Sequence, residues 1–325
     1  MVASATGKGA ACHGFERGAA VSGAESGSEA SEKDPFGWRE ERDGFVRAFA
    51  GAWIFGIPLL FTMEMWWIGR TASWKQQLVF AGIALATCLG LNYAAGFRRE
   101  RKPTSFHRRM DDTIDAFAVG LIAATVTLVV INRIRLSDSL ESTLGLIVLQ
   151  ALPLSVGASF ASHVFRRESG SPSTGESTGD EDQGEEGELE RPHGHSQFRN
   201  LLAELGVTAI GGVALGVSIA PTDEIYLIAS GMRPVHLVAS IIFSLLVSYA
   251  IVYASGFGSR PRDVPLKSAS SVTVFAYAVS LATAFATLVL FGMVDLEDGF
   301  EMIVAQTIVM AIPTTMGGAA GRLLV

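Results

Sequence analysis

Residues 113–134 read TIDAFAVGLIAATVTLVVINRI, an apolar run with one acid near its start and one basic residue near its end. An α-helix rises about 1.5 Å per residue, so about 20 apolar residues cross the roughly 30 Å hydrocarbon core of a bilayer. The run is too long and too evenly apolar for a helix that keeps one face in water. It therefore predicts a transmembrane helix.

Further runs of the same kind lie before and after this stretch. They cover residues 45–69, 75–97, 142–165, 201–229, 234–257, 271–293 and 299–323. The chain of 325 residues is 49% hydrophobic and only 18% charged, whereas soluble domains carry about 25% charged residues. Composition and spacing together predict an all-α polytopic membrane helix bundle with eight transmembrane helices.

Lysine and arginine residues are concentrated in alternate loops. Most lie before the first run and in the segments that follow the second, fourth and sixth runs. The opposite loops contain only Arg70, Lys75, Arg133, Arg135 and Arg233. Because cytoplasmic loops are enriched in Lys and Arg, both termini are predicted to be cytoplasmic.

Two stretches outside the apolar runs have the composition of disordered segments. Residues 1–43 are rich in Gly, Ala, Ser and Glu, and residues 166–200 are rich in Gly, Ser and acids. Such segments cannot bury enough apolar surface to fold. We expect a disordered cytoplasmic tail over 1–43 and an acidic disordered linker over 166–200, which divides the membrane part into 44–165 and 201–325.

A shift of 160 residues aligns these two membrane segments without a gap. YAAGF at residues 93–97 matches YASGF at 253–257, and ALP at 151–153 matches AIP at 311–313. The constant offset across all the helices argues against a chance likeness of apolar sequences. The pattern predicts two tandem repeats of four helices. An even number of helices makes the repeats parallel, related by an axis along the membrane normal.

Glu64 and Glu224 are the sharpest candidates for an ion or proton site, because each lies in the first predicted helix of its repeat. Each follows a threonine by two residues, Thr62 and Thr222. An acid inside a membrane is costly and by default marks an ion or proton pathway. In the other interpretation the acids lie near the outer membrane boundary, where an acid beside Trp66 is simply solvated. Both interpretations stay open.

Pro58 and Pro221 precede these two acids by a few residues. Proline can kink a membrane helix and free a backbone carbonyl, and a broken helix beside an acid is a common arrangement for an ion site. An ordinary kink is the simpler alternative. The two prolines do not match under the shift of 160 residues, which weakens the argument for a site.

Small residues recur at a spacing of four in the first and fourth predicted helices of each repeat. This spacing lets helix backbones approach closely. We expect close helix packing at Ala52, Gly56, Pro153 and Gly157 in the first repeat and at Gly212, Gly216, Pro313, Gly317 and Gly321 in the second.

Nothing in the sequence predicts an enzyme, a cofactor or a metal site. The glycine-rich phosphate loop, the serine-hydrolase motif and the zinc-protease motif are all missing from the sequence. His193 and His195 stand in the predicted linker without further ligands. A nucleic-acid partner is not expected, since the sequence has no basic stripe. The expected partners are the lipid bilayer and a cation, proton or small solute, and the oligomeric state is not indicated.

Three motifs carry a resemblance to a known family. They are FTMEMWW at residues 61–67, AGF at the end of the second run, and DDTIDAF at residues 111–117. With these motifs the chain resembles an uncharacterised family of prokaryotic integral membrane proteins that bears a domain-of-unknown-function label. The resemblance extends over most of the chain beyond residue 40. It implies a multi-pass protein of the cell membrane and supplies no activity, substrate or catalytic residue.

The sequence supports two functional hypotheses. The first is a transporter or channel for a cation, protons or a small solute, with its path between the repeats and with Glu64 and Glu224 contributing. The second is a membrane scaffold or sensor that transports nothing and acts through its tail and linker. The second hypothesis expects both acids to be exposed and no polar path through the core.

Overall fold

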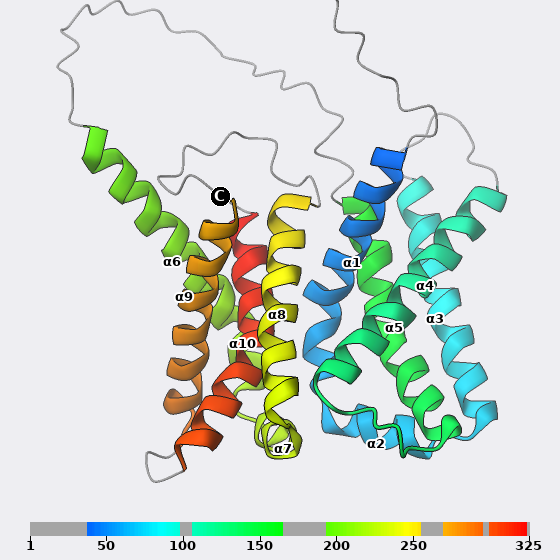
Figure 1. The fold of residues 1–325 in the computed structure, drawn as a ribbon. Helices are drawn as coiled ribbons and strands as arrows, with labels where there is room; N and C mark the ends of the chain where they lie inside the picture. Colours follow the sequence, from blue (N-terminus) through cyan, green and yellow to red (C-terminus); the bar gives the residue numbers. More distant parts are fainter. Residues whose placement is uncertain (1–37, 98–105, 165–192, 255–268, 295–298, 324–325) are drawn as a thin grey trace, which may run out of the picture. The chain divides into compact units, whose positions relative to one another are not determined.

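The computed structural model describes residues 38–97, 106–164, 193–254, 269–294 and 299–323 (Figure 1). The residues described in the first half of the chain form α1 (Trp38–Leu60), α2 (Met63–Thr71), α3 (Trp74–Phe97), α4 (Phe106–Val130) and α5 (Leu140–Val164). Those of the second half form α6 (His193–Ile219), α7 (Glu224–Gly231), α8 (Pro234–Tyr249), the π-helix η2 (Ala250–Ala254), α9 (Ala269–Leu290) and α10 (Phe300–Arg322). Residues 1–37 of the predicted tail and 166–192 of the predicted linker lie outside the described residues, whereas residues 38–43 belong to α1 and residues 193–200 belong to α6, so the predicted disorder is wrong for these two short stretches.

Seven of the described helices are long and apolar enough to cross a membrane by themselves. A further pair, Ala203–Ile219 and Glu224–Gly231, passes the same test together but is bent by 92°, so the described residues contain seven spans, or eight if this pair counts as one. The all-helical prediction and the prediction of several membrane-spanning helices are therefore confirmed. The repeat arrangement and the location of the termini stay predictions.

The structure corrects two of the predicted helices. Residues 45–69 and 201–229 do not form continuous helices, because α1 ends at Leu60 before α2 begins, and α6 ends at Ile219 before α7 begins. Proline explains the second break, since Pro221 lacks a backbone N–H and disfavours a helical residue before it. Pro58 lies within the last turn of α1, where it removes one helical hydrogen bond.

α5 and α10 are the central helices of the two halves. α5 contacts α1, α2, α3 and α4, and α10 contacts α6, α7, α8 and α9. Small residues allow the closest of these contacts. A Cβ atom on Gly157 of α5 would lie 2.6 Å from the carbonyl oxygen of Gly51 in α1, which is closer than real Cβ contacts come. Only glycine therefore fits this contact without a shift of the backbone.

The helices α4 and α9 end in the same kind of turn. Asn132 and Gly292 follow these helices with φ values of 56° and 66°. Their backbone amides donate to the carbonyls of Val129 and Val289, each at 3.1 Å. Glycine adopts this left-handed conformation freely and asparagine tolerates it, so both residues suit a sharp reversal at the end of a helix.

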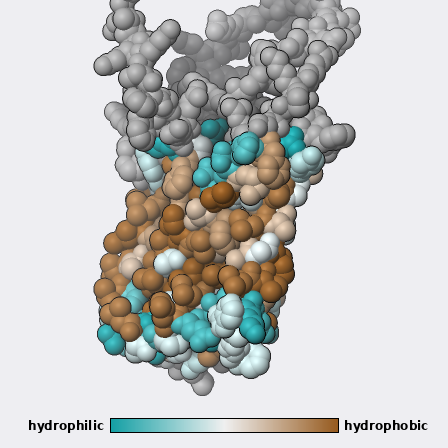
Figure 2. All heavy atoms as spheres, turned by 90° about the vertical axis from the view of Figure 1, so that its right-hand side faces the viewer, coloured by the Kyte–Doolittle hydropathy of each residue, from teal (hydrophilic) through white to brown (hydrophobic). Residues whose placement is uncertain are grey.

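The surface of the described helices has the polarity expected for contact with lipid. Figure 2 shows the side on which α3 lies, with a broad hydrophobic band between more hydrophilic residues above and below. Leu78, Val79 and Ile83 of α3 are all exposed on the molecule. Exposed aliphatic side chains over a whole helix are expected where acyl chains replace water as the solvent.

Candidate functional site

Glu64 and Glu224 lie in the first turns of the short helices α2 and α7. Both positions follow the breaks at which α1 and α6 end, so neither acid lies within one of the seven helices that can span a membrane by themselves. Glu64 is exposed and Glu224 is half-buried. An acid in the first turn of a helix is stabilised by the helix dipole, which accounts for both positions in structural terms.

The two threonines named with these acids bond to the helices that precede them. The Thr62 hydroxyl donates to the Pro58 carbonyl at 3.1 Å. The Thr222 hydroxyl donates to the Ile219 carbonyl at 2.7 Å. Each hydroxyl thus adds a hydrogen bond to a carbonyl in the last turn of the preceding helix. Both threonines stabilise the breaks between α1 and α2 and between α6 and α7.

A hydrogen bond between the two halves brings the two acidic segments together. The backbone N–H of Met63 donates to Oε1 of Glu224 at 3.2 Å. The Glu224 carboxylate therefore caps the N-terminus of α2 from the other half of the chain, where unpaired N–H groups favour a negative charge. Because Glu64 follows Met63 directly, the boundary between the halves holds both acids.

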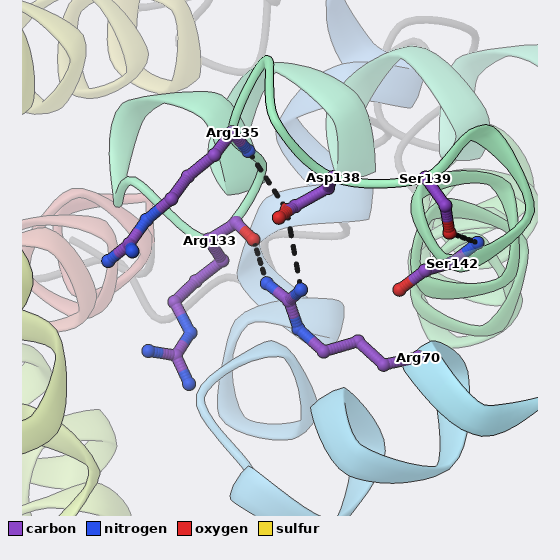
Figure 3. A network of polar contacts seen from close by, with 6 residues as sticks. All are labelled: Arg70, Arg133, Arg135, Asp138, Ser139 and Ser142. Atoms are coloured by element: carbon purple, nitrogen blue, oxygen red, sulfur yellow. Dashed lines mark hydrogen bonds and ion pairs between the residues drawn. The ribbon is translucent and has the colours of Figure 1, made fainter.

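A basic network lies in the loop between α4 and α5 (Figure 3). Arg70 of α2 forms an ion pair with Asp138 at 3.3 Å and also donates to the Arg133 carbonyl. The same Asp138 carboxylate oxygen accepts the backbone N–H of Arg135 at 3.1 Å. At the end of the loop the Ser139 hydroxyl oxygen accepts the backbone N–H of Ser142 at 3.3 Å, in the manner of a helix N-cap.

Arg133 has a different environment from Arg70. Its guanidinium carbon lies 3.9 Å from the centre of the Trp66 ring, an arrangement typical of a cation–π contact. Its Nε atom is buried and has no hydrogen-bond partner among the described residues. Burial, followed by the neighbouring charges of Arg70 and Arg135, lowers the pKa of Arg133 to about 10.

The same loop makes a second contact between the halves. The Asn132 side-chain amide donates to the Gly231 carbonyl, at the end of α7, at 2.6 Å. A Cβ on Gly231 would lie 3.7 Å from an Arg135 guanidinium nitrogen. Figure 3 shows the side chains of Arg133 and Arg135 extending to the same side, away from the pair formed by Arg70 and Asp138.

The residues expected to mediate helix packing lie at contacts within each half. Gly51 and Gly157 meet where α1 crosses α5, and the Gly56 position faces Leu154 across the same pair of helices. In the second half Gly211 meets Gly317, and Gly216 faces Thr314. Ala52, Pro153, Gly212, Pro313 and Gly321 are buried as well.

The sequence interpretation missed the network of Arg70, Arg133, Arg135 and Asp138. In the sequence its arginines were used only as loop charges, to predict which side of the membrane each loop faces. One signal was available, since two arginines and an aspartate within six residues, between two apolar runs, give an unusually charged short loop. No sequence feature predicts that Arg133 stacks on Trp66. The contact depends on the break after α1, which lets α2 lie across the ends of the spanning helices.

Comparison with known proteins identifies the family to which the chain belongs. A family model described as "Putative integral membrane protein (DUF2391)" matches residues 44–325. Neither the curated proteins nor the solved structures gave a match. The match covers most of the chain and confirms the resemblance seen in the motifs, so the chain belongs to this family of integral membrane proteins of unknown function.

Proposed function

We propose that the protein is a transporter or channel for a cation, protons or a small solute, with its path between two tandem parallel repeats of four spanning helices. Both termini lie on the cytoplasmic side of the cell membrane in this proposal. Glu64 and Glu224 then stand at the outer entrance of the path and not at its centre.

Recurring contacts support the tandem repeat. Gly51 meets Gly157 in the first half, and their counterparts 160 residues later, Gly211 and Gly317, meet in the second. The left-handed turns after α4 and α9 also lie 160 residues apart. Recurrence of the same backbone contacts at one offset is expected from duplication, and shared apolar composition alone does not explain it.

The observation that carries the transport proposal is the meeting of two discontinuous helices at the boundary of the halves. Each half begins with a long helix that ends at a short break, and the short helices after the breaks start next to one another, joined by the bond from Met63 to Glu224. Transporters often place substrate and ion sites where discontinuous helices from two repeats meet. At a helix break, backbone N–H and C=O groups are free to bind a ligand, whereas in a continuous helix they form hydrogen bonds with each other.

Two buried amides provide further support. Gln150 and Gln306 lie on the central helices α5 and α10 and are 0% and 1% exposed. Neither amide has a hydrogen-bond partner among the described residues. Buried polar groups are normally bonded, so these amides suit an interior that water or a polar solute enters.

The exposure of Glu64 favours a second function, that of a membrane scaffold or sensor. This hypothesis expects acids that face water, and Glu64 meets that expectation. It would act through the N-terminal tail and the acidic linker, and it needs no passage through the core. Neither hypothesis requires catalysis or a cofactor.

Flux measurements on the purified full-length protein in proteoliposomes test the transport proposal. Cation and proton flux is measured for the wild type, Glu64→Gln and Glu224→Gln. The glutamine introduced by Glu224→Gln can still accept the Met63 N–H, so the cap persists while the charge is removed. We expect the wild type to pass cations or protons and the flux of each variant to be about tenfold lower. Each variant loses a negative charge that concentrates cations at the entrance.

Glu141→Gln is the matched control, because Glu141 is an exposed acid in the first turn of α5 at the same ends of the helices. Its flux should equal that of the wild type. Folded wild-type protein that passes neither cations nor protons would reject the ion pathway and favour the scaffold. Equal flux in all four proteins would remove Glu64 and Glu224 from the path.

A further inference from the structure

We propose that Arg133 and Arg135 form a binding site for a phosphate group at the boundary between the two halves. The group can belong to a phospholipid headgroup or to soluble phosphate, since both offer the same oxygens to a guanidinium. The proposal goes beyond transport and does not depend on it, because the site can bind phosphate whether or not anything crosses the membrane.

The charge balance of the loop leaves two guanidinium groups without an acid. Three arginines, Arg70, Arg133 and Arg135, lie in the network with one aspartate, Asp138 (Figure 3). Among the described residues that carboxylate pairs with the Arg70 side chain and otherwise accepts only the backbone N–H of Arg135. Among the described residues neither Arg133 nor Arg135 has an ion pair with an acid, so both guanidinium charges remain for an anion.

The nearby acids do not supply the missing charge. Glu224 directs its carboxylate to the Met63 N–H and forms no ion pair among the described residues. Glu64 and Asp223 lie in the same region and are exposed, and neither forms an ion pair within the described part of the chain. The uncompensated charge is therefore local to the loop and to the end of α7 that it contacts.

Arg133 is held in place before any ligand binds. Its guanidinium stacks on Trp66, and the Trp66 ring N–H donates to the Leu60 carbonyl at 2.7 Å. Its own backbone carbonyl accepts from Arg70. A stacked guanidinium keeps its N–H donors in the plane of the group, where they can make paired hydrogen bonds to phosphate oxygens. The Nε atom is buried and has no partner among the described residues, so the terminal guanidinium nitrogens are the donors proposed to contact phosphate.

The position of the loop places the two arginines at the depth of lipid headgroups. The loop joins the ends of two spanning helices, at Val130 and Leu140. Leu136 and Leu140 are exposed, at 110% and 74%, and Trp67 of the adjacent α2 is 69% exposed. Exposed apolar and tryptophan side chains beside a span end are typical of the membrane interface, where phospholipid phosphates lie.

The second half of the chain shows that the fold itself does not require these arginines. At the offset of 160 residues, Arg133 corresponds to Met293, Arg70 to Ser230 and Trp66 to Tyr226. A turn of the same conformation precedes Met293. Burying the charged side chain of Arg133 costs free energy, and the second half avoids this cost because its counterpart is Met293. A role in binding therefore explains Arg133 better than a role in folding.

The test uses the full-length protein in nanodiscs of phosphatidylcholine, with and without phosphatidylglycerol, and in detergent with inorganic phosphate. Native mass spectrometry measures retained lipid, and the unfolding temperature measures the effect of phosphate. The variants are Arg133→Met, which introduces the residue of the second half, and Arg133→Lys. We expect Arg133→Met to bind about tenfold more weakly, the loss expected for one or two charged hydrogen bonds. Arg133→Lys should be intermediate, because an ammonium cannot form the paired bonds.

Lys75→Met is the control, since Lys75 is an exposed basic residue at the same helix ends and lies outside the network. Retention of phosphatidylglycerol that depends on Arg133 and not on Lys75 supports a lipid site. Stabilisation by inorganic phosphate with the same dependence supports a soluble ligand. Binding of both ligands that survives Arg133→Met and Arg133→Lys overturns the proposal, as does wild-type protein that binds neither. If Arg133→Met does not fold, Arg133→Lys and Arg135→Ala decide the question in the same way.

Discussion

Arg133 shows how a single side chain can carry a charge that its surroundings do not balance. Burial and two neighbouring arginines lower its pKa to about 10, yet this value is still well above physiological pH. A guanidinium is positive below its pKa and neutral above it. Arg133 therefore stays charged at neutral pH, and the charge is held at a cost because it forms no ion pair with an acid among the described residues.

This leads to a prediction about pH. Binding of phosphatidylglycerol, whose phosphate diester keeps its charge, should be constant from about pH 6 to about pH 9 and should weaken as the pH rises through about 10. Arg133 loses its proton in that upper range, and the electrostatic attraction is lost with it. Lipid retention measured across this pH series checks the prediction. A loss of binding centred near neutral pH would contradict it, because only a group such as histidine titrates there.

At the scale of the helix, the apolar pattern predicted most boundaries but not the two breaks. Hydropathy depends on composition, and α2 and α7 continue the apolar runs of α1 and α6 without a change in composition. A break at 61–62 or 220–223 depends on proline position and on local capping, which composition does not record. The locations of Glu64 and Glu224 depended on these breaks, so the sequence identified the candidate acids and could not decide their depth.

The contacts between helices support a prediction about glycine. A Cβ on Gly211 would lie 3.0 Å from the carbonyl carbon of Gly317, and one on Gly51 would lie 2.7 Å from the Gly157 oxygen. Gly211→Ala and Gly51→Ala should each destabilise the protein by about 1–3 kcal/mol, as overpacking does. Gly206, also in α6, has nothing within 4 Å of its Cβ position. Thermal unfolding in detergent compares the variants.

Gly206→Ala is the control for this series, and it should leave stability unchanged or raise it by up to about 1 kcal/mol, since alanine favours helix more than glycine does. Equal loss of stability at Gly206 and Gly211 would show that backbone contact is not the cause. Similar losses at Gly51 and Gly211 are expected if duplication has preserved the same crossing in both halves.

At the scale of the whole chain, the likeness of the halves could be seen in the sequence, but their contact could not. Most residues in the described contacts between the halves differ from their counterparts at the offset of 160, with Glu224 and its counterpart Glu64 as an exception. Trp53 of α1 packs edge-on against Phe243 of α8 with ring centres 5.4 Å apart. The residues that correspond to Trp53 and Phe243 are Val213 and Ile83. An alignment of the repeats identifies the residues that the halves have in common. The contact between the halves depends mostly on residues in which they differ, so the alignment does not predict it.

The proposed topology places the ends of α2 and α7 outside the cell and the segments after α3 and η2 inside it. Single cysteines in a chain with Cys12→Ser and Cys88→Ser can test this in intact cells with a thiol reagent that does not cross membranes. Ser73 and Ser139 are exposed at the α2 end of the helices, so Ser73→Cys and Ser139→Cys should react at once. Ser105→Cys and Ser259→Cys, in the loops rich in Lys and Arg, should react only after the membrane is permeabilised. The reverse pattern would invert the topology, and it would place the arginine loop at the cytoplasmic leaflet, where anionic lipids are most abundant.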